Sequence, residues 1–105
     1  MALGGAIAPY ARAGAIVNAD GSVIRSKGVT AVRKTATGRY CIELEAGIDA
    51  STALVVATPK WGANWDSIVL VNEGPVDCGD ASRNVFVGTG RPSGAADEPF
   101  VVVVL

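Results

Sequence analysis

The stretch GVTAVRKTATGRYCIEL, residues 28–44, predicts a β-hairpin. In its second half, larger apolar side chains occur at every second residue, which is the two-residue period of a strand with one buried face and one outer face. The buried set is Tyr40, Ile42 and Leu44, and the outer set is Cys41 and Glu43. Gly38 supplies the positive φ that a three-residue hairpin loop requires. The hairpin consists of a strand, a turn and a returning strand: Val29 to Thr35, Ala36-Thr37-Gly38, and Arg39 to Leu44.

The rest of the chain continues this pattern of short apolar stretches between turn-forming residues. The other predicted strands are Tyr10–Val17, Ser22–Ser26, Thr52–Thr58, Ser67–Asn72, Asn84–Thr89 and Phe100–Leu105. Residues 1–9 are expected to be irregular and residues 88–99 to form a mobile connection. No helical period of useful length interrupts the series. The 105 residues therefore predict one all-β domain, a single antiparallel β-sandwich of about eight strands with a jelly-roll-like arrangement.

The composition favours self-association. Charged residues make up 18% of the chain, against about 25% in an average soluble protein. The strands SIVLVN (residues 67–72) and FVVVVL (residues 100–105) are apolar on both faces. The outer face of an antiparallel sandwich is usually polar, so we expect a loop or another subunit to cover these strands. A homo-oligomer is the expectation, and a monomeric sandwich is the alternative.

Two classes of partner are not expected. The net charge is −1 and the basic residues are scattered, so no nucleic-acid surface is predicted. The longest strictly apolar run, Val101 to Leu105, is far shorter than the roughly 20 residues of a membrane span, so no membrane insertion is predicted. The start of the chain has no early Lys or Arg and is a poor signal peptide. We therefore expect a soluble chain.

The two cysteines, Cys41 and Cys78, permit one disulfide without arguing for it. By strand alternation Cys41 shares a face with Glu43 and Glu45, whereas Cys78 lies in a polar loop. Free thiols are the expectation. An intramolecular or an interchain bridge is the alternative.

A series of short motifs spans most of the chain. They are Ala11-Arg12, Val17-Asn18-Ala19-Asp20-Gly21, Lys27-Gly28-Val29-Thr30 with Val32, Gly38-Arg39-Tyr40, Ala57-Thr58-Pro59 and Pro99-Phe100-Val101-Val102-Val103. In this order the chain resembles the C-terminal β-sandwich domains of phage tail-fibre-like proteins and of related small bacterial proteins. That family often has a cysteine just before the strand ending in Ala-Thr. Here Ser51-Thr52-Ala53 stands at that place, which weakens any transfer of a disulfide. The resemblance implies a trimeric binding head, at a fibre tip or alone, in a virion or tail-like particle.

The segment KWGANWD, residues 60–66, is the best candidate for a ligand site. Aromatic faces beside amide and carboxylate groups bind sugars by stacking and hydrogen bonding, and loops commonly carry binding residues. The predicted ligand-binding residues are Trp61, Asn64, Trp65 and Asp66. The alternative is that one or both rings cap the sandwich or pack at a subunit contact.

Two groups of carboxylates are weaker candidates. The first is Asp77, Cys78 and Asp80, with Asp97 and Glu98 from another loop, whose spacing matches neither an EF-hand nor a zinc pattern. Solvated turn carboxylates are expected there, with no metal and no cofactor. The second is Glu43 and Glu45, a pair that suits glycoside hydrolysis but lies on the expected solvent face, opposite Arg33 or Lys34.

The chain contains no histidine, which removes the commonest general base and every His-dependent triad. No catalytic residues are predicted, and the protein is not expected to be an enzyme. The expected function is a non-enzymatic, trimeric, tail-fibre-like head that binds a cell-surface ligand such as a glycan. The alternative is a structural trimerisation module with no specific ligand.

Overall fold

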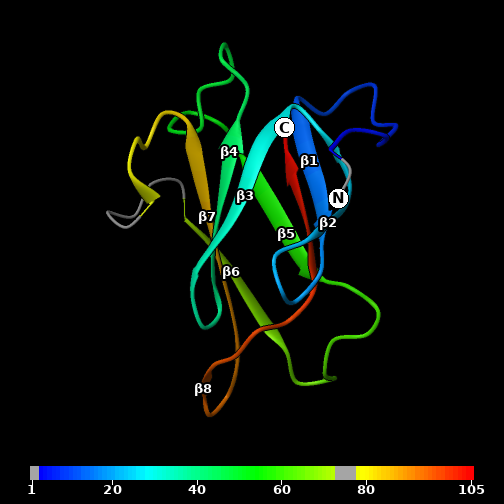
Figure 1. Cartoon of the computed structure of the whole chain (residues 1–105), viewed down its shortest axis with the longest axis vertical. Helices are drawn as coiled ribbons and strands as arrows, with labels where there is room; N and C mark the ends of the chain where they lie inside the picture. Colours follow the sequence, from blue (N-terminus) through cyan, green and yellow to red (C-terminus); the bar gives the residue numbers. More distant parts are fainter. Residues whose placement is uncertain (1–2, 73–77) are drawn as a thin grey trace.

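A computed structural model describes residues 3–72 and 78–105 of the chain. The regular elements in this part are nine β-strands (Figure 1). They are β1 (Ala13–Val17), β2 (Val23–Lys27), β3 (Val29–Ala36), β4 (Arg39–Leu44), β5 (Val55–Pro59), β6 (Ile68–Asn72), β7 (Asn84–Arg91), β8 (Gly94–Ala95) and β9 (Phe100–Val104). No helix in the described residues has the length and apolarity needed to cross a membrane.

The strands form two antiparallel sheets that pack face to face. One sheet has the order β2-β1-β9-β5, and the other has the order β3-β4-β7-β6, with β8 paired to β7. The first and last strands are neighbours, since Ala13 lies opposite Val104 and Val17 opposite Phe100. The edge strands β5 and β6 belong to different sheets but contact each other. The predicted all-β sandwich is confirmed.

The hairpin at residues 28–44 forms as predicted, with one change at its turn. In β3 and β4, Val32 lies opposite Ile42 and Lys34 opposite Tyr40. Ala36 still belongs to β3, so the turn is Thr37-Gly38 rather than three residues. Gly38 has φ +69°, and its peptide is held on both sides: its N–H donates to Asp97 Oδ1 at 2.7 Å and its carbonyl accepts from Thr89 N at 2.8 Å.

The core is built from small apolar side chains around one aromatic contact between the sheets. Tyr40 of β4 and Phe100 of β9 are both fully buried, with ring centroids 4.9 Å apart in an edge-to-face arrangement. The Tyr40 hydroxyl donates to Ala19 O at 2.6 Å, which ties the β1–β2 turn to the opposite sheet. Burial raises the pKa of the Tyr40 phenol, so the hydroxyl stays protonated as a donor.

Cys41 and Cys78 form a disulfide, so the expectation of free thiols is wrong. Cys41 is fully buried on the outer side of β4, because the segment carrying Cys78 lies over it. Arg33 of β3 fastens the same segment through hydrogen bonds from its Nη2 to Cys78 O at 3.0 Å and Asn84 Oδ1 at 2.9 Å. Strand alternation predicts the direction of Cys41, but not that a segment 37 residues away covers it.

The ends of several elements differ from the predicted ones. Strand β1 begins at Ala13 rather than Tyr10, and the Tyr10 side chain is almost wholly exposed. The predicted connection at residues 88–99 contains an unpredicted short hairpin of β7 and β8. This hairpin requires Gly90, since a Cβ there would lie 2.8 Å from Gly94 O. Residues 3–9 form no strand, although Gly4 and Ala6 bond to Ser26 of β2.

Removal of the disulfide is predicted to destabilise the protein strongly. In the chain-entropy model, a bridge across 37 residues contributes about 4 kcal/mol, because it restricts the unfolded chain. We expect the double variant Cys41→Ser/Cys78→Ser to lose about that much free energy of unfolding in urea. Wild type treated with reductant is the matched control and should show the same loss. An unchanged unfolding midpoint in both samples would contradict the bridge.

The turn glycine is predicted to be irreplaceable. A Cβ at Gly38 would collide with Thr89 O in addition to requiring positive φ, so Gly38→Ala should cost about 2–5 kcal/mol of folding free energy. Gly47 also has positive φ, at +96°, but meets nothing within 4 Å. Gly47→Ala is therefore the control and should cost only the conformational part, about 1–2 kcal/mol. Equal losses measured by urea unfolding would show that the turn is not tightly packed.

Candidate ligand-binding loop

The candidate site is the loop of residues 60–67, which joins β5 to β6. It begins directly after Pro59, and its backbone makes two successive turns: Ala63 N donates to Lys60 O at 2.9 Å, and Ser67 N donates to Asn64 O at 3.0 Å. Lys60 N donates to Pro99 O at 3.1 Å, which ties the start of the loop to the segment before β9. The loop therefore has a defined backbone path, although it lies outside both sheets (Figure 1).

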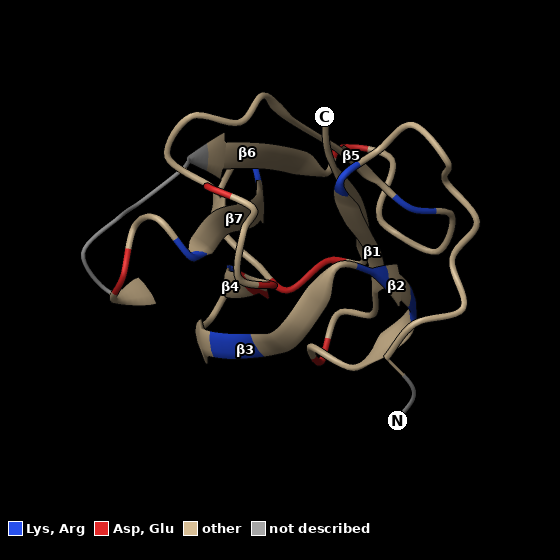
Figure 2. Cartoon of the chain, turned by 90° about the horizontal axis from the view of Figure 1, so that it is seen from above, with Lys and Arg blue, Asp and Glu red and all other residues tan. Residues whose placement is uncertain are grey.

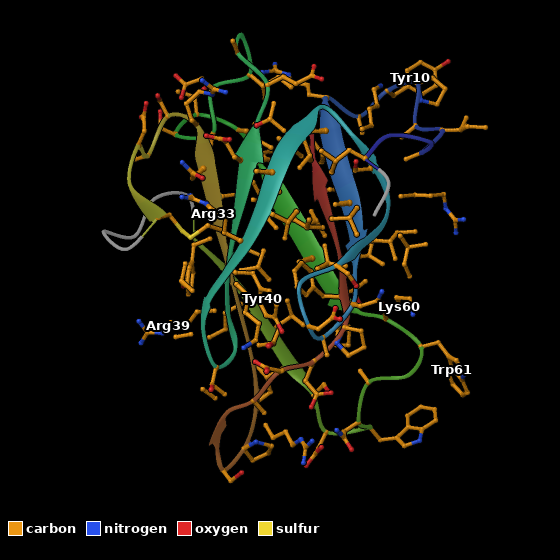
Figure 3. The ribbon with its side chains drawn as sticks, in the orientation of Figure 1. Tyr10, Arg33, Arg39, Tyr40, Lys60 and Trp61 are labelled. Carbon is orange, nitrogen blue, oxygen red and sulfur yellow. A yellow bond between two sulfur atoms is a disulfide. The ribbon has the colours of Figure 1, made fainter. Side chains whose placement is uncertain are left out.

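Both tryptophans of this loop project into solvent. The Trp61 side chain is 83% exposed and Trp65 is 92% exposed. Their ring centroids are 5.6 Å apart, and the ring planes are nearly perpendicular at 85°. Figure 3 shows Trp61 pointing away from the sandwich. Neither ring caps the sandwich of its own chain, so that alternative is wrong. The two exposed rings contact each other instead.

The loop borders an open hollow of about 450 Å³. Its lining is formed by Thr58, Pro59, Lys60, Trp61, Gly62, Ala63, Asn64, Trp65 and Ser67. Lys60 supplies the charge in this lining, and its ammonium donates to Trp61 O at 3.2 Å. Small-molecule sites commonly occupy about 300–1,000 Å³ and combine aromatic walls with a few polar groups. The hollow matches that description in size and chemistry.

Glu98 holds the loop from beneath. This carboxylate is 1% exposed and lies between β8 and β9. Its Oε1 accepts from Asn64 N at 3.0 Å and from Ser67 Oγ at 2.9 Å. Its Oε2 accepts from Asn64 Nδ2 at 2.9 Å and from Arg91 Nε at 3.0 Å. One side chain therefore connects the loop, the end of β7 and the approach to β9.

The ionisation of Glu98 follows from its contacts. Burial alone raises the pKa of a carboxyl group because it disfavours the charged form. The hydrogen bonds donated by Asn64, Ser67 and Arg91 outweigh burial and lower the pKa of Glu98 to about 2. The carboxylate is thus charged at neutral pH, and the positive Arg91 is its partner. A buried charge that is paired and hydrogen-bonded fixes the position of the groups around it.

The four predicted site residues take different roles in the structure. Trp61 and Trp65 present exposed rings, and Asp66 is exposed beside Trp65. The Asn64 amide nitrogen is directed to Glu98, so Asn64 positions the loop instead of offering this donor to a ligand. Glu98 was predicted as a carboxylate of a turn, and its role as the anchor of the loop was missed. The sequence gives little sign of it, because the donors from the loop, Asn64 and Ser67, lie 34 and 31 residues earlier in the chain.

The predicted metal candidates are not assembled into a site. Asp77 lies outside the described residues, and the described part of the chain contains no group of three or more potential metal ligands. The other members each have a partner within the protein. Cys78 is bonded to Cys41, and Asp80 accepts hydrogen bonds from the N–H and hydroxyl of Ser82. Asp97 pairs with Lys34 and accepts from the N–H of Gly38, and Glu98 accepts from Asn64 of the loop.

Of the second carboxylate pair, Glu43 is hydrogen-bonded within the hairpin and Glu45 is exposed. Glu43 Oε1 accepts from Thr30 Oγ1 at 2.9 Å, and Glu45 is exposed. Glu43 lies opposite Ala31 in the hairpin. The predicted positions opposite Arg33 or Lys34 are wrong, because those residues lie opposite Cys41 and Tyr40 respectively.

Comparison of the chain with family models, with curated proteins and with solved structures finds no match.

Acid is predicted to release the anchor of the loop. Because the pKa of Glu98 is about 2 in the folded chain and about 4.3 in an unfolded one, its stabilisation is fully present above about pH 5 and disappears as the pH falls toward 2. Glu98→Gln should lose about 2 kcal/mol or more of unfolding free energy at pH 7, since a buried charged hydrogen-bond network is broken. Plotted against pH, the unfolding free energies of the wild type and of Glu98→Gln should converge near pH 2.

The control is Glu45→Gln, which alters an exposed carboxylate without these donors. Hydrogen bonds from Ser22 and Ser82 also lower the pKa values of Asp20 and Asp80, so all three proteins keep some acid sensitivity. The informative quantity is the difference in unfolding free energy between the wild type and each variant at each pH, measured by urea unfolding followed by circular dichroism. A difference for Glu98→Gln that is independent of pH would contradict the assignment.

Proposed function

We propose that the protein is a non-enzymatic binding head that attaches to a cell-surface glycan through Trp61 and Trp65, acting as a trimer of the tail-fibre-like kind. The observation that carries the proposal is an exposed tryptophan pair on a loop fixed from beneath by a buried carboxylate. Exposed aromatic rings on a positioned loop are suited to binding, because little ordering entropy remains to be lost when a ligand arrives.

The chemistry of the hollow suits a saccharide. The C–H faces of sugar rings pack on indole, and the indole N–H and the Lys60 ammonium offer donors to hydroxyl groups. The two rings stand nearly perpendicular, at 85°, so they present faces in different directions. Such a pair suits a branched or curved oligosaccharide better than a flat linear chain.

The residues near the loop favour binding over catalysis. The chain has no histidine. Glu98 is buried under the loop and committed to Asn64, Ser67 and Arg91. Paired carboxylates in glycoside hydrolysis need an acid and a base that both face the substrate, and Glu98 is not among the residues that line the hollow.

A second candidate is a structural trimerisation module without a specific ligand. Exposed apolar side chains on and next to the edge strands favour it: Val56 of β5 is 57% exposed, Leu70 of β6 is 66% exposed, and Leu54, just before β5, is 74% exposed. These side chains explain a subunit contact but not the tryptophan pair, which lies in the loop beyond the strands. The binding head accounts for both features and is therefore preferred.

Ligand binding is predicted to depend on each tryptophan separately. In a glycan array followed by calorimetry, Trp61→Ala and Trp65→Ala should each lower affinity about tenfold or more, which corresponds to about 1.4 kcal/mol. The melting temperature should hold, since both rings are exposed. Tyr10→Ala is the matched control, because the Tyr10 ring is 97% exposed and lies outside the loop. Absence of any glycan ligand for the wild type would favour the structural module.

A further inference from the structure

We infer that the loop of residues 60–67 selects an anionic saccharide, a sugar that carries a carboxylate or a sulfate group, and that the Lys60 ammonium recognises this charge. The inference deepens the proposed function and rests on it, because it names the class of glycan that the hollow beside Trp61 and Trp65 accepts. The alternative is a neutral sugar held by ring stacking and hydroxyl contacts alone.

The position of Lys60 is fixed through its backbone and through its side chain. Lys60 N donates to Pro99 O at 3.1 Å, and Lys60 O accepts from Ala63 N at 2.9 Å. The half-buried side chain folds back so that its ammonium donates to Trp61 O at 3.2 Å. An ammonium has three N–H donors. Within the described residues this contact occupies one of them, which leaves two for a ligand.

The ammonium lies next to an exposed aromatic ring. Its acceptor is a backbone atom of Trp61, whose side chain is 83% exposed. Figure 3 shows Lys60 at the end of β5 and Trp61 further out along the same loop. A sugar unit stacked on the Trp61 ring brings an acidic group at its edge toward the ammonium. Apolar contact and charge recognition therefore lie side by side.

The charge that borders the hollow has one sign. Between Val55 and Asn72 the charged residues are Lys60 and Asp66. Figure 2 shows strands β5 and β6, which flank the loop, without a charged residue. Lys60 is among the residues that line the hollow, whereas Asp66 is exposed and is not. A ligand in the hollow therefore meets a positive group in its wall.

Lys60 has no carboxylate partner in the described part of the chain. The acidic residues on the segment that Lys60 N contacts are already paired, Asp97 with Lys34 and Glu98 with Arg91. A ligand that covers the loop displaces water from around the ammonium and strengthens its attraction for an anion. The missing counter-ion is therefore best supplied by the ligand.

The same lysine excludes a cationic ligand. Aromatic side chains also bind quaternary ammonium groups over their faces, so two exposed tryptophans alone fit either class. A cation in this hollow would lie beside the Lys60 ammonium and be repelled by it. A neutral sugar would use the rings and leave the positive charge without a counterpart. An anionic sugar uses both, with its C–H face on the indole and its acidic group on Lys60.

Paired glycans test the inference at neutral pH. The probes are sialylated, uronate-containing and sulfated oligosaccharides, each compared by calorimetry with its desialylated, methyl-esterified or desulfated form. The wild type should bind the charged member of a pair about tenfold more tightly, as expected for one charge-assisted hydrogen bond. This preference should fall severalfold between about 0.02 M and about 0.5 M salt, because salt screens charges. The separate pairs show whether the anion is a carboxylate or a sulfate.

Three variants assign the preference to Lys60. Lys60→Gln keeps an N–H donor without the charge, so it should bind both members of a pair equally, with the wild-type affinity for the neutral one. Lys60→Arg keeps the charge and should keep the preference. Lys27→Gln is the matched control, because the Lys27 ammonium also donates to a backbone carbonyl, Ala8 O at 2.6 Å, but lies outside the loop. It removes the same net charge and should behave like the wild type.

The outcomes separate this inference from the function on which it rests. Equal affinity of the wild type for both members of every pair would overturn the charge selection and leave the glycan site standing. A preference that survives in Lys60→Gln, or that is lost equally in Lys27→Gln, would also overturn it, since another basic residue or the net charge would then be responsible. Binding of neither member of any pair would remove the proposed glycan site together with the inference.

Discussion

The contact between Tyr40 and Phe100 fixes how the two sheets face each other. The rest of the core consists mainly of Ala and Val, which fill space but specify little orientation. An edge-to-face aromatic pair at 4.9 Å sets both the distance and the relative position of β4 and β9. The Tyr40 hydroxyl extends the constraint to the β1–β2 turn through Ala19 O. A sandwich with so few aromatic residues depends on where this one pair meets.

The same contact leads to the candidate site. Phe100 is buried at the first position of β9, so the chain just before it must pass under the end of the sandwich, and Glu98 enters the interior two residues earlier. There its carboxylate meets Asn64 and Ser67, and these contacts hold the tryptophan loop. Core packing therefore determines the position of a polar anchor, and the anchor determines the position of two exposed rings. This order explains how a loop outside both sheets has a defined path.

Features that depend on local sequence pattern, such as strands and loops, could be predicted from the sequence. Contacts between segments far apart in the chain could not. Alternation in residues 39–44 correctly identified the buried face of Tyr40, Ile42 and Leu44, and the loop with both tryptophans was located correctly. The Cys41–Cys78 bridge was missed because strand alternation says which way Cys41 points and not what lies over it. Asn64 was predicted to bind a ligand because amides next to aromatic residues do so in many loops. In the structure the Asn64 amide nitrogen donates to Glu98, which is adjacent only after β7, β8 and β9 have folded.

The strands β3 and β4 differ from β5 and β6 in their charge and in what covers them, and this difference bears on the function of the protein. Around β3 and β4 the outer surface is charged and closed by the disulfide, with Arg33 fastening the covering segment. Strands β5 and β6 themselves contain no charged residue, and the Leu70 side chain is 66% exposed. Natural sheets usually protect an apolar edge from pairing, and the trimer proposed above would bury this one.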